Sequence, residues 1–405
     1  MIPYGYKQTE VGVIPEDWEL LLLGKTAKVY RGGSPRPIQS YITNSSNGVN
    51  WIKIGDVREN DKYIYSTQEK IRPDGISMSR EVHIGDFILS NSMSFGRPYI
   101  LRTNGCIHDG WLTIQEYGQA FSTEYLYYVL SSKIIYKQYI GMAAGSSVKN
   151  LNKDKVTSLM VICPPLPEQQ RIAEALSDVD GMISSLEKLI AKYKSIKTAC
   201  LQQMFPQNGE TVPRMRLPGF TGAWEQRKFE EIAVRSSVIC SDDTLPRVEY
   251  EDIVSGTGRL NKDIYAKQSS KSGIAFHQGD VLYGKLRPYL QNWLLPTFDG
   301  LAVGDFWVLQ PQNADGSFLY RLIQSRQFDE VANQSTGTKM PRADWKLVSK
   351  TVFSIPSNIS EQAAIGTYFT ALDSLITLHQ RKLEKIQKIK QGMMQQLLTG
   401  KIRLL

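Results

Sequence analysis

Two segments of this chain carry the same long apolar pattern, and that pattern restricts the folds open to it. In residues 172–204 apolar side chains recur at steps of 4, 3, 4, 3, 4, 3, 3, 4 and 4, and residues 365–397 repeat those steps with His379 as a polar exception. Alternating threes and fours place the side chains on one stripe of a helix. At a rise of 1.5 Å per residue, each helix is roughly 50 Å long. A stripe of that length needs a partner helix, and we expect each copy to pair with the other.

The predicted coiled-coil seam has one principal alternative, in which each helix packs only on its own domain. His379 on the seam either sets the register of the pair or is a histidine at its edge that bonds to a neighbour. The seam residues in the prediction are Ile172, Leu176, Val179, Ile183, Leu186, Ile190, Ile365, Phe369, Leu372, Ile376, Leu383 and Ile386.

The repeat extends beyond the helices. A His-x-Gly-Asp motif occurs at 83–86 and again at 277–280, and each copy is followed by Arg-Pro-Tyr, at 97–99 and 287–289. A Gly followed a few residues later by a Trp comes next in both copies, at 105–111 and 300–307. With the two outer matches this makes five matches in one order across both halves, which indicates an internal duplication. The first copy is the longer one within its globular part. The outer matches are Trp18-Glu19 with Trp224-Glu225, and Glu168-Gln169 with Glu361-Gln362.

The globular segments differ in amino-acid composition from the helices. They are rich in Tyr, Trp, Ile, Val, Gly and Asn, with short strand-like runs such as 49–54 and 306–309. We therefore predict an α+β chain of two compact mixed α/β domains and two long helices. The predicted boundaries are a first domain over 1–163, a helix over 164–206, a second domain with its linker over 207–356 and a helix over 357–405.

Charge and cysteine content narrow the class of protein. The net charge of +8 suits a polyanionic partner, either nucleic acid or an acidic membrane surface. The four cysteines are scattered, with no C-x-x-C pair and no histidine at metal-ligand spacing, which indicates a reducing compartment and no metal site. No secretory signal and no apolar run of roughly 18 residues is visible, so we expect a cytoplasmic protein with no membrane span.

Enzyme signatures are incomplete wherever they occur. Gly24-Lys25-Thr26 resembles the end of a P-loop, but position 19 is Glu where the motif needs Gly. Cys163-Pro164-Pro165-Leu166 lacks the polar and aromatic residues of the amino-methyltransferase motif. Asp344-Trp345-Lys346 has the spacing of a nuclease metal motif without a suitable upstream acid. We predict no catalytic residues in this chain.

Two loops that recur in both copies combine cations, aromatics and small polar residues. One contains Arg-Pro-Tyr (91–99 and 283–289), and the other precedes the last strand of each domain (145–150 and 336–342). Arg and Lys pair with phosphates or guanine, and Asn pairs with adenine. Positions shared by both copies are equally consistent with a structural turn. The candidate DNA-binding residues are Arg31, Arg36, Lys53, Arg58, Arg97, Tyr99, Ser146, Lys149, Asn150, Arg247, Lys285, Arg287, Tyr289, Thr338, Lys339 and Arg342.

Base-reading residues should lie where the copies diverge, because two domains that read different sequences differ at the residues that contact bases. The divergent stretches are 31–47 and 53–62 in the first copy and 247–271 in the second.

Two motifs carry a resemblance to a known family. Pro-Pro-Leu-Pro-Glu-Gln-Gln-Arg-Ile-Ala at 164–173 and Gly-Asp-Val-Leu-Tyr-Gly-Lys-Leu-Arg-Pro-Tyr at 279–289, in a chain of two domains each followed by a long helix, resemble the specificity subunit of a type I restriction-modification system. The resemblance covers essentially the whole chain. The second copy departs from it at 355–364, where one proline replaces three before the helix.

The resemblance implies that each domain is a target recognition domain reading one half of a bipartite site on double-stranded DNA. The two helices would run antiparallel with pseudo-twofold symmetry and fix the spacer. Two modification (methyltransferase) subunits would bind S-adenosylmethionine and methylate adenine N6, and restriction (translocase/nuclease) subunits would use ATP and Mg. This chain itself would hold no cofactor. The alternatives are a stand-alone two-site DNA-binding protein and a coiled-coil scaffold for protein interactions.

Overall fold

The computed structural model describes residues 2–58, 61–91, 96–143, 151–207, 209–266, 269–334 and 340–405. The chain divides into two compact units: Met1–Ser185 with Lys382–Leu405, and Leu186–Arg381. Each unit holds one globular part and a stretch of both long helices, α5 (Leu166–Gln203) and α10 (Ile359–Leu397). The helices begin within two residues of their predicted starts. The units thus cut across the predicted domain boundaries, because each helix packs partly with the globular part of the other copy.

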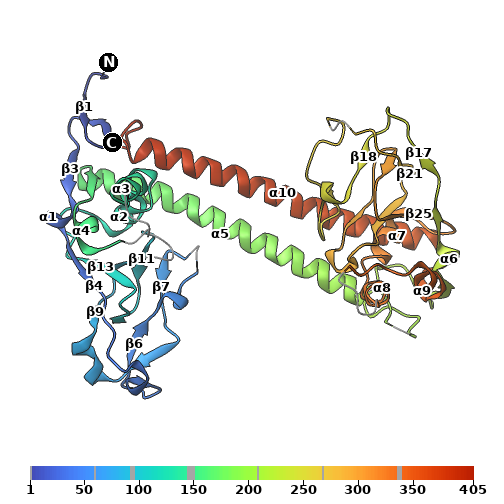
Figure 1. Cartoon of the computed structure of the whole chain (residues 1–405), viewed down its shortest axis with the longest axis horizontal. Coiled ribbons are helices and arrows are strands. Elements are labelled where there is room, and N and C mark those ends of the chain that lie inside the picture. Colours follow the sequence, from blue (N-terminus) through green and yellow to red (C-terminus); the bar gives the residue numbers. More distant parts are fainter. Residues whose placement is uncertain are drawn as a thin grey trace. The chain divides into compact units, whose positions relative to one another are not determined.

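The globular part of the first unit is a mixed α/β domain (Figure 1). Its helices are α1 (Leu23–Thr26), α2 (Thr123–Leu130), α3 (Lys133–Ala143) and α4 (Lys153–Thr157), with 3-10 turns η1 (Ile38–Ser40), η2 (Ile54–Asp56) and η3 (Pro73–Met78). Its strands are β1 (Tyr6–Thr9), β2 (Gly12–Pro15), β3 (Glu19–Leu22), β4 (Lys28–Arg31), β5 (Ile42–Thr43), β6 (Val49–Ile52), β7 (Tyr63–Ile64), β8 (Glu69–Ile71), β9 (Arg80–Val82), β10 (Phe87–Ser90), β11 (Pro98–Leu101), β12 (Gly105–Ile107), β13 (Trp111–Gln115) and β14 (Met160–Cys163).

The globular part of the second unit has a parallel inventory (Figure 1). Its helices are α6 (Phe229–Ile232), α7 (Gly316–Leu322), α8 (Arg326–Ala332) and α9 (Trp345–Lys350), with 3-10 turns η4 (Tyr250–Asp252) and η5 (Pro288–Leu290). Its strands are β15 (Glu225–Lys228), β16 (Ala233–Ser236), β17 (Ile239–Cys240), β18 (Arg247–Val248), β19 (Ile253–Val254), β20 (Arg259–Leu260), β21 (Gly273–Phe276), β22 (Val281–Gly284), β23 (Trp293–Leu294), β24 (Gly300–Ala302), β25 (Phe306–Pro311) and β26 (Val352–Ile355).

The sheets of the two units share most of their strands. The first unit has the order β4-β13-β10-β11-β7 where the second has β16-β25-β22-β23, and β9-β12-β6 corresponds to β21-β24-β18. The pair β14-β3 likewise corresponds to β15-β26. Much of the extra length of the first copy lies between β4 and β6, in residues 32–48 against 237–246 of the second, where it forms η1 and β5. The predicted fold, a duplicated mixed α/β domain with two long helices, is confirmed.

The recurring His-x-Gly-Asp motif is a tight turn in both units. The carboxylate of Asp86 accepts a hydrogen bond from the backbone N–H of His83 at 2.8 Å, and Asp280 does the same for His277 at 2.9 Å. The glycine in each turn has a positive φ, +96° at Gly85 and +93° at 279. Only glycine adopts that conformation without steric cost. The motif is therefore conserved between the copies by turn geometry.

The two long helices run antiparallel within each unit. In the first unit Asp180 of α5 forms an ion pair with Lys390 of α10 at 2.6 Å, while α5 begins beside the segment that follows α10. In the second unit Lys197 of α5 pairs with Asp373 of α10, also at 2.6 Å, and Tyr193 stacks on His379. As the residue number rises along one helix it falls along the other. This confirms the predicted pairing of the two copies.

Each helix starts at a buried glutamate. Glu168 accepts hydrogen bonds from the indole N–H of Trp18 at 3.0 Å and from Arg403 at 2.8 Å. The following residue anchors the domain as well, because the side chain of Gln169 accepts a 2.9 Å hydrogen bond from the backbone N–H of Ser122, just before α2. The second unit repeats these contacts with Glu361, Trp224, Arg216, Gln362 and Asp315. The matched Trp-Glu and Glu-Gln letters thus mark the junctions between helix and domain.

The predicted seam residues are all buried or half-buried. The ends of the helices enter the cores of the globular parts: Leu397 packs with the core around Phe87, and Met204 with the core around Phe318. The predicted apolar stripe is wrong at Ile389, which is 46% exposed, and the next residue, Lys390, forms the ion pair with Asp180. No helix among the described residues is long and apolar enough to cross a membrane.

Candidate nucleic-acid interface

The two loops singled out in the sequence lie side by side in the second unit, where residues 340–342 of the later loop are described. In the second unit the backbone N–H of Ala343 donates to Lys285 at 2.8 Å, and that of Arg287 donates to Pro341 at 2.7 Å. In the first unit the N–H of Leu151 donates to Asn91 at 2.8 Å. In the second unit both loops thus contribute to one surface of the globular part. The two globular parts are called the first and the second domain hereafter.

A carboxylate organises the cations of this surface in the second domain. Asp305, directly before β25, lies 2.9 Å from Nη2 of Arg342 and 3.5 Å from Nζ of Lys285. The hydrogen bond from Arg342 is the main reason that the pKa of Asp305 lies below its usual value. Arg342 remains 52% exposed at its side chain. The arrangement presents two cations from two loops at fixed positions, and phosphate and base edges accept such donors.

The first domain has a related cluster around Asp109, directly before Gly110 and β13. Its carboxylate accepts hydrogen bonds from Ser34 at 3.1 Å and from Arg36 at 3.4 Å, while its backbone carbonyl accepts one from Arg31 at 3.4 Å. The side chain of Arg36 is 81% exposed. The exposed pair contributes little to stability, so these arginines remain available to an anionic ligand.

Three further cations among the described residues of the first domain were predicted from the sequence. Lys53 follows β6 and pairs with Glu69 at 2.5 Å, and Arg58 is exposed in the loop after η2. Arg97 is half-buried and lines a hollow with Tyr127 and Tyr128. The predicted residues Ser146, Lys149, Asn150, Thr338 and Lys339 lie outside the described residues.

Two predicted DNA contacts are core residues instead. Tyr99 is 1% exposed and packs edge-to-face on Trp111, with the ring centroids 5.8 Å apart. Arg247 is 5% exposed, and its guanidinium donates to the carbonyl of Lys271 at 2.7 Å and to Asp243 at 2.8 Å. In the sheet register Arg247 takes the position that the first domain gives to the buried Trp51. Neither side chain is free to contact DNA, so both predictions are corrected.

The shared Arg-Pro-Tyr letters adopt different structures in the two domains. In the first domain Pro98 already belongs to strand β11, whereas in the second the partner strand β23 begins only at Trp293. Residues 287–290 therefore form an additional turn, with Arg287 at a φ of +48° and Tyr289 57% exposed. The Nε of Arg287 is buried without a partner among the described residues. Of the two tyrosines, Tyr289 alone is presented to solvent.

The acidic residues that position the cations are not among the residues predicted from the sequence. Asp109 comes just before β13, which begins at Trp111, and Asp305 comes just before β25, which begins at Phe306. That placement was visible in the sequence. It was overlooked because a lone aspartate in a loop has no distinctive pattern. Among the described residues no group of three or more His, Cys, Asp or Glu side chains is placed to hold a metal ion.

Comparison with known proteins gives a consistent family. The model described as the type I restriction modification DNA specificity domain matches residues 15–196 and 253–388. The type I restriction enzyme MjaVIII specificity subunit of Methanocaldococcus jannaschii is 22% identical, over 96% of this chain and 94% of its own length. The type I restriction enzyme EcoDI specificity subunit of Escherichia coli is 22% identical, over 84% of this chain and 78% of its own length.

Solved structures share the fold. A chain from work on complex assembly and conformational transition of the type I R-M system matches with a TM-score of 0.60 at 15% identity, covering 96% of this chain and 99% of that one. The type I restriction-modification S subunit from M. genitalium matches with a TM-score of 0.58 at 13% identity, covering 94% and 96%. The fold and paired loops define a chain with two recognition domains on two antiparallel helices. The chain belongs to the type I restriction modification DNA specificity family.

Proposed function

We propose that this chain reads a bipartite site on double-stranded DNA, one half with each recognition domain, and directs adenine-N6 methylation and restriction by partner subunits. The observation that carries the proposal is the pair of related clusters in the two domains, in which Asp109 or Asp305, just before a core strand, positions exposed cations. In the second domain these cations come from two neighbouring loops. The residues around these aspartates differ between the domains, as two different half-sites require.

Catalysis belongs to the partners in this proposal, and this chain is a non-catalytic subunit. Its sequence carries no complete nucleotide-binding, methyltransferase or nuclease motif. S-adenosylmethionine would be bound by modification subunits, and ATP and Mg by restriction subunits. The pseudo-twofold repeat offers equivalent surfaces on the two long helices, which supports two modification subunits for each copy of this chain. Since its partner is chromosomal DNA, we place the chain in the cytoplasm.

The test is a binding selection with the full chain, co-purified with the methyltransferase encoded beside it, on random duplex DNA. We expect two short motifs at one fixed spacing, with affinity that falls steeply as salt rises. The variant Lys285→Ala/Arg342→Ala should relax preference in one half-site and leave the other unchanged. Arg227→Ala, which removes an exposed arginine from β15 outside these loops, is the control. A contiguous motif, or binding insensitive to salt, would contradict the proposal.

A further inference from the structure

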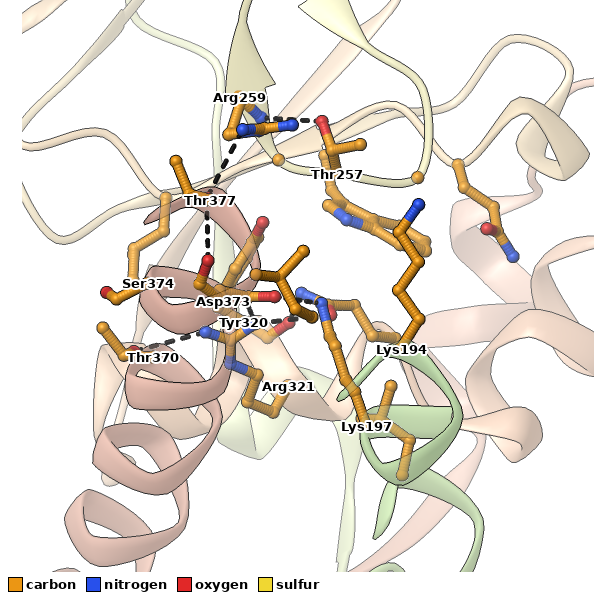
Figure 2. A pocket seen from close by; sticks show the side chains of 18 of the residues that line it. Lys194, Lys197, Thr257, Arg259, Tyr320, Arg321, Thr370, Asp373, Ser374 and Thr377 are labelled. Atoms are coloured by element: carbon orange, nitrogen blue, oxygen red, sulfur yellow. Dashed lines mark hydrogen bonds and ion pairs between the residues drawn. The ribbon is translucent and has the colours of Figure 1, made fainter. Parts of the chain in front are cut away.

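The second unit contains a cationic cavity that the proposed DNA-reading surface does not explain. It has a volume of about 1160 Å³ and is walled by the β19–β20 turn, α7 and the parts of α5 and α10 that belong to this unit (Figure 2). Cations outnumber carboxylates among the described residues that line it. The cations are Lys194, Lys197, Arg259, Arg321, Arg326 and Arg381, and the carboxylates are Asp329 and Asp373.

Two cations share one carboxylate on the wall of the cavity. Arg321 Nη1 lies 2.7 Å from Asp373 Oδ2, and Lys197 Nζ lies 2.6 Å from Oδ1 of the same side chain (Figure 2). The side chain of Arg321 is only 3% exposed, and its Nε is buried with no partner among the described residues. The three side chains together carry one more positive than negative charge, and the further hydrogen bonds of Arg321 go to the neutral side chains of Thr370 and Gln324. Buried charge of this kind is costly without a counterion.

The equivalent group in the first unit has one cation and one carboxylate, so it carries no net charge. There Asp180 pairs with Lys390 at 2.6 Å, and its second oxygen accepts a hydrogen bond from the hydroxyl of Tyr128 at 2.8 Å. Tyr128 on α2 holds the place that Arg321 holds on α7. A neutral tyrosine satisfies the same aspartate in one unit, so stability alone does not require the arginine in the other.

The pKa of Lys197 lies below its usual value, and burial is the main cause. Burial lowers the pKa of Lys197, and the neighbouring charge of Arg321 lowers it further, so that the pairing with Asp373 does not restore its usual value. An anion in the cavity would offset both effects.

Side chains narrow the corresponding space in the first unit, where a smaller hollow of about 330 Å³ remains beside Tyr128 and Lys390. After turn η2, Lys62 places its ammonium 4.4 Å from the ring centroid of Tyr128 and 4.6 Å from that of Tyr127. After the equivalent turn η4, the second unit has Gly258, where a Cβ would lie 1.7 Å from the Tyr320 hydroxyl. A residue with a side chain cannot stand there without displacing Tyr320, so the cavity stays open.

The open side of the cavity offers further donors. Arg259 donates to Thr377 at 3.3 Å and to Gln380 at 3.0 Å, which holds the β19–β20 turn against α10 (Figure 2). Lys194 and Arg381 are exposed at the rim, and neither side chain has an ion pair among the described residues. Forked guanidinium groups, ammonium groups and hydroxyls form the donor set that proteins use for phosphate.

We propose that this cavity binds phosphate groups. Its size exceeds that of one phosphate and suits either a stretch of sugar–phosphate backbone or a free phosphorylated molecule. The β19–β20 turn belongs to the divergent stretch 247–271, which favours DNA as the source. The DNA source rests on the proposed function, whereas binding of free phosphate does not.

The first experiment compares two charge-matched variants of the full chain in its complex with the modification subunit. Lys194→Ala/Arg381→Ala removes two rim cations, and Lys188→Ala/Lys192→Ala removes two exposed cations of α5 that do not line the cavity. With DNA as the source, the rim variant binds duplex about tenfold more weakly than the control variant, and its salt slope falls by roughly one for each lost phosphate contact.

The second experiment measures the melting temperature in inorganic phosphate and pyrophosphate against chloride of matched ionic strength. For a free phosphorylated ligand, these anions raise the melting temperature of the wild type and of the control variant but not of Arg321→Tyr. That substitution copies Tyr128 of the first unit, so the hydroxyl can still reach Asp373 and the fold should be retained.

Each outcome separates the hypotheses. Weaker DNA binding by the rim variant alone supports the DNA source, and loss of the phosphate shift in Arg321→Tyr with unchanged DNA affinity supports the free ligand. If neither measurement distinguishes the cavity variants from their controls, the proposal is overturned. It is also overturned if the rim variant loses only its partner subunit, because the cavity would then bind an acidic protein surface. A wild-type complex that fails to bind DNA would contradict the proposed function instead.

Discussion

Glu168 and Glu361 hold equivalent positions at the starts of the two long helices, and each accepts hydrogen bonds from an arginine that follows the other helix. Arg403, after α10, contacts Glu168, and Arg216, after α5, contacts Glu361. Each unit is therefore closed by segments from both copies, because the start of one helix is tied to the chain that leaves the other. The folding of each unit then depends on residues far apart in the sequence.

Replacing Glu361 with a neutral residue should lower the stability of the second unit considerably. Glu361 is 2% exposed and Arg216 only 15% exposed at its side chain, so Glu361→Gln leaves a buried arginine without its counterion. We expect the free energy of unfolding to fall by about 3 kcal/mol, as for other broken buried pairs. Urea titration of the variant gives the value. Glu225→Gln breaks the exposed pair with Arg227 and should cost under about 1 kcal/mol; equal losses in both variants would contradict the account.

The first unit should lose stability in acid through the same contact. Burial raises the pKa of Glu168, but the hydrogen bonds from Arg403 and Trp18 outweigh it and bring the pKa below its usual value. The folded pKa is lowered, so this contribution is complete above the unfolded value of about 4.3 and is lost as pH falls through the folded pKa. We expect the urea midpoint of the wild type to fall more steeply below that pH than the midpoint of Glu168→Gln. Parallel pH profiles would show that the contact does not titrate as described.

Glycine substitutions test the His-x-Gly-Asp turn. A Cβ at Gly279 would meet no atom within 4 Å, so the cost of Gly279→Ala comes from its φ of +93° alone. The expected loss is about 1–2 kcal/mol. Gly392 in α10 also has open space and no positive φ, and alanine there should stabilise the chain by up to about 1 kcal/mol. Thermal unfolding of the two variants should shift in opposite directions; a shared direction would contradict the turn assignment.

In the cluster around Asp305 of the second domain, substitutions of two neighbouring residues should change DNA affinity in opposite directions. Arg342→Ala removes a donor and should weaken duplex binding about two- to fivefold, whereas Asp305→Asn releases Arg342 and Lys285 from a competing charge and should strengthen it by a similar factor at low salt. Fluorescence anisotropy across a salt series measures both. The increase should disappear at high salt, and a loss of affinity in Asp305→Asn would show that holding the two cations in place matters more than removing the competing charge.

The sequence predicted the long helices and the duplicated domain well, because a heptad stripe and a repeated order of motifs are local signals. It could not predict the role of Glu168 or Glu361, since their arginine partners follow the opposite helix. The Glu-Gln pairs shared by the two copies marked these positions as important but did not show what the glutamates contact. The structure supplies that reason through the antiparallel pairing.

The candidate site was predicted less well, because identical letters did not imply identical structure. Arg-Pro-Tyr leads into a buried strand in the first domain and forms an exposed turn in the second, so Tyr99 and Tyr289 have opposite environments. Arg247 appeared to be a surface cation but replaces a core tryptophan of the other copy. Only the register of the sheet, which depends on distant strands, distinguishes these cases.

The central claim is that the two recognition domains read two separate half-sites. Methylation-sensitive sequencing of DNA from cells that carry this gene with its neighbouring methyltransferase tests it most directly. The account predicts one motif with two specified halves, a spacer of fixed length and a methylated adenine in each half. A single uninterrupted motif, or no methylated motif while the methyltransferase is expressed, would contradict it.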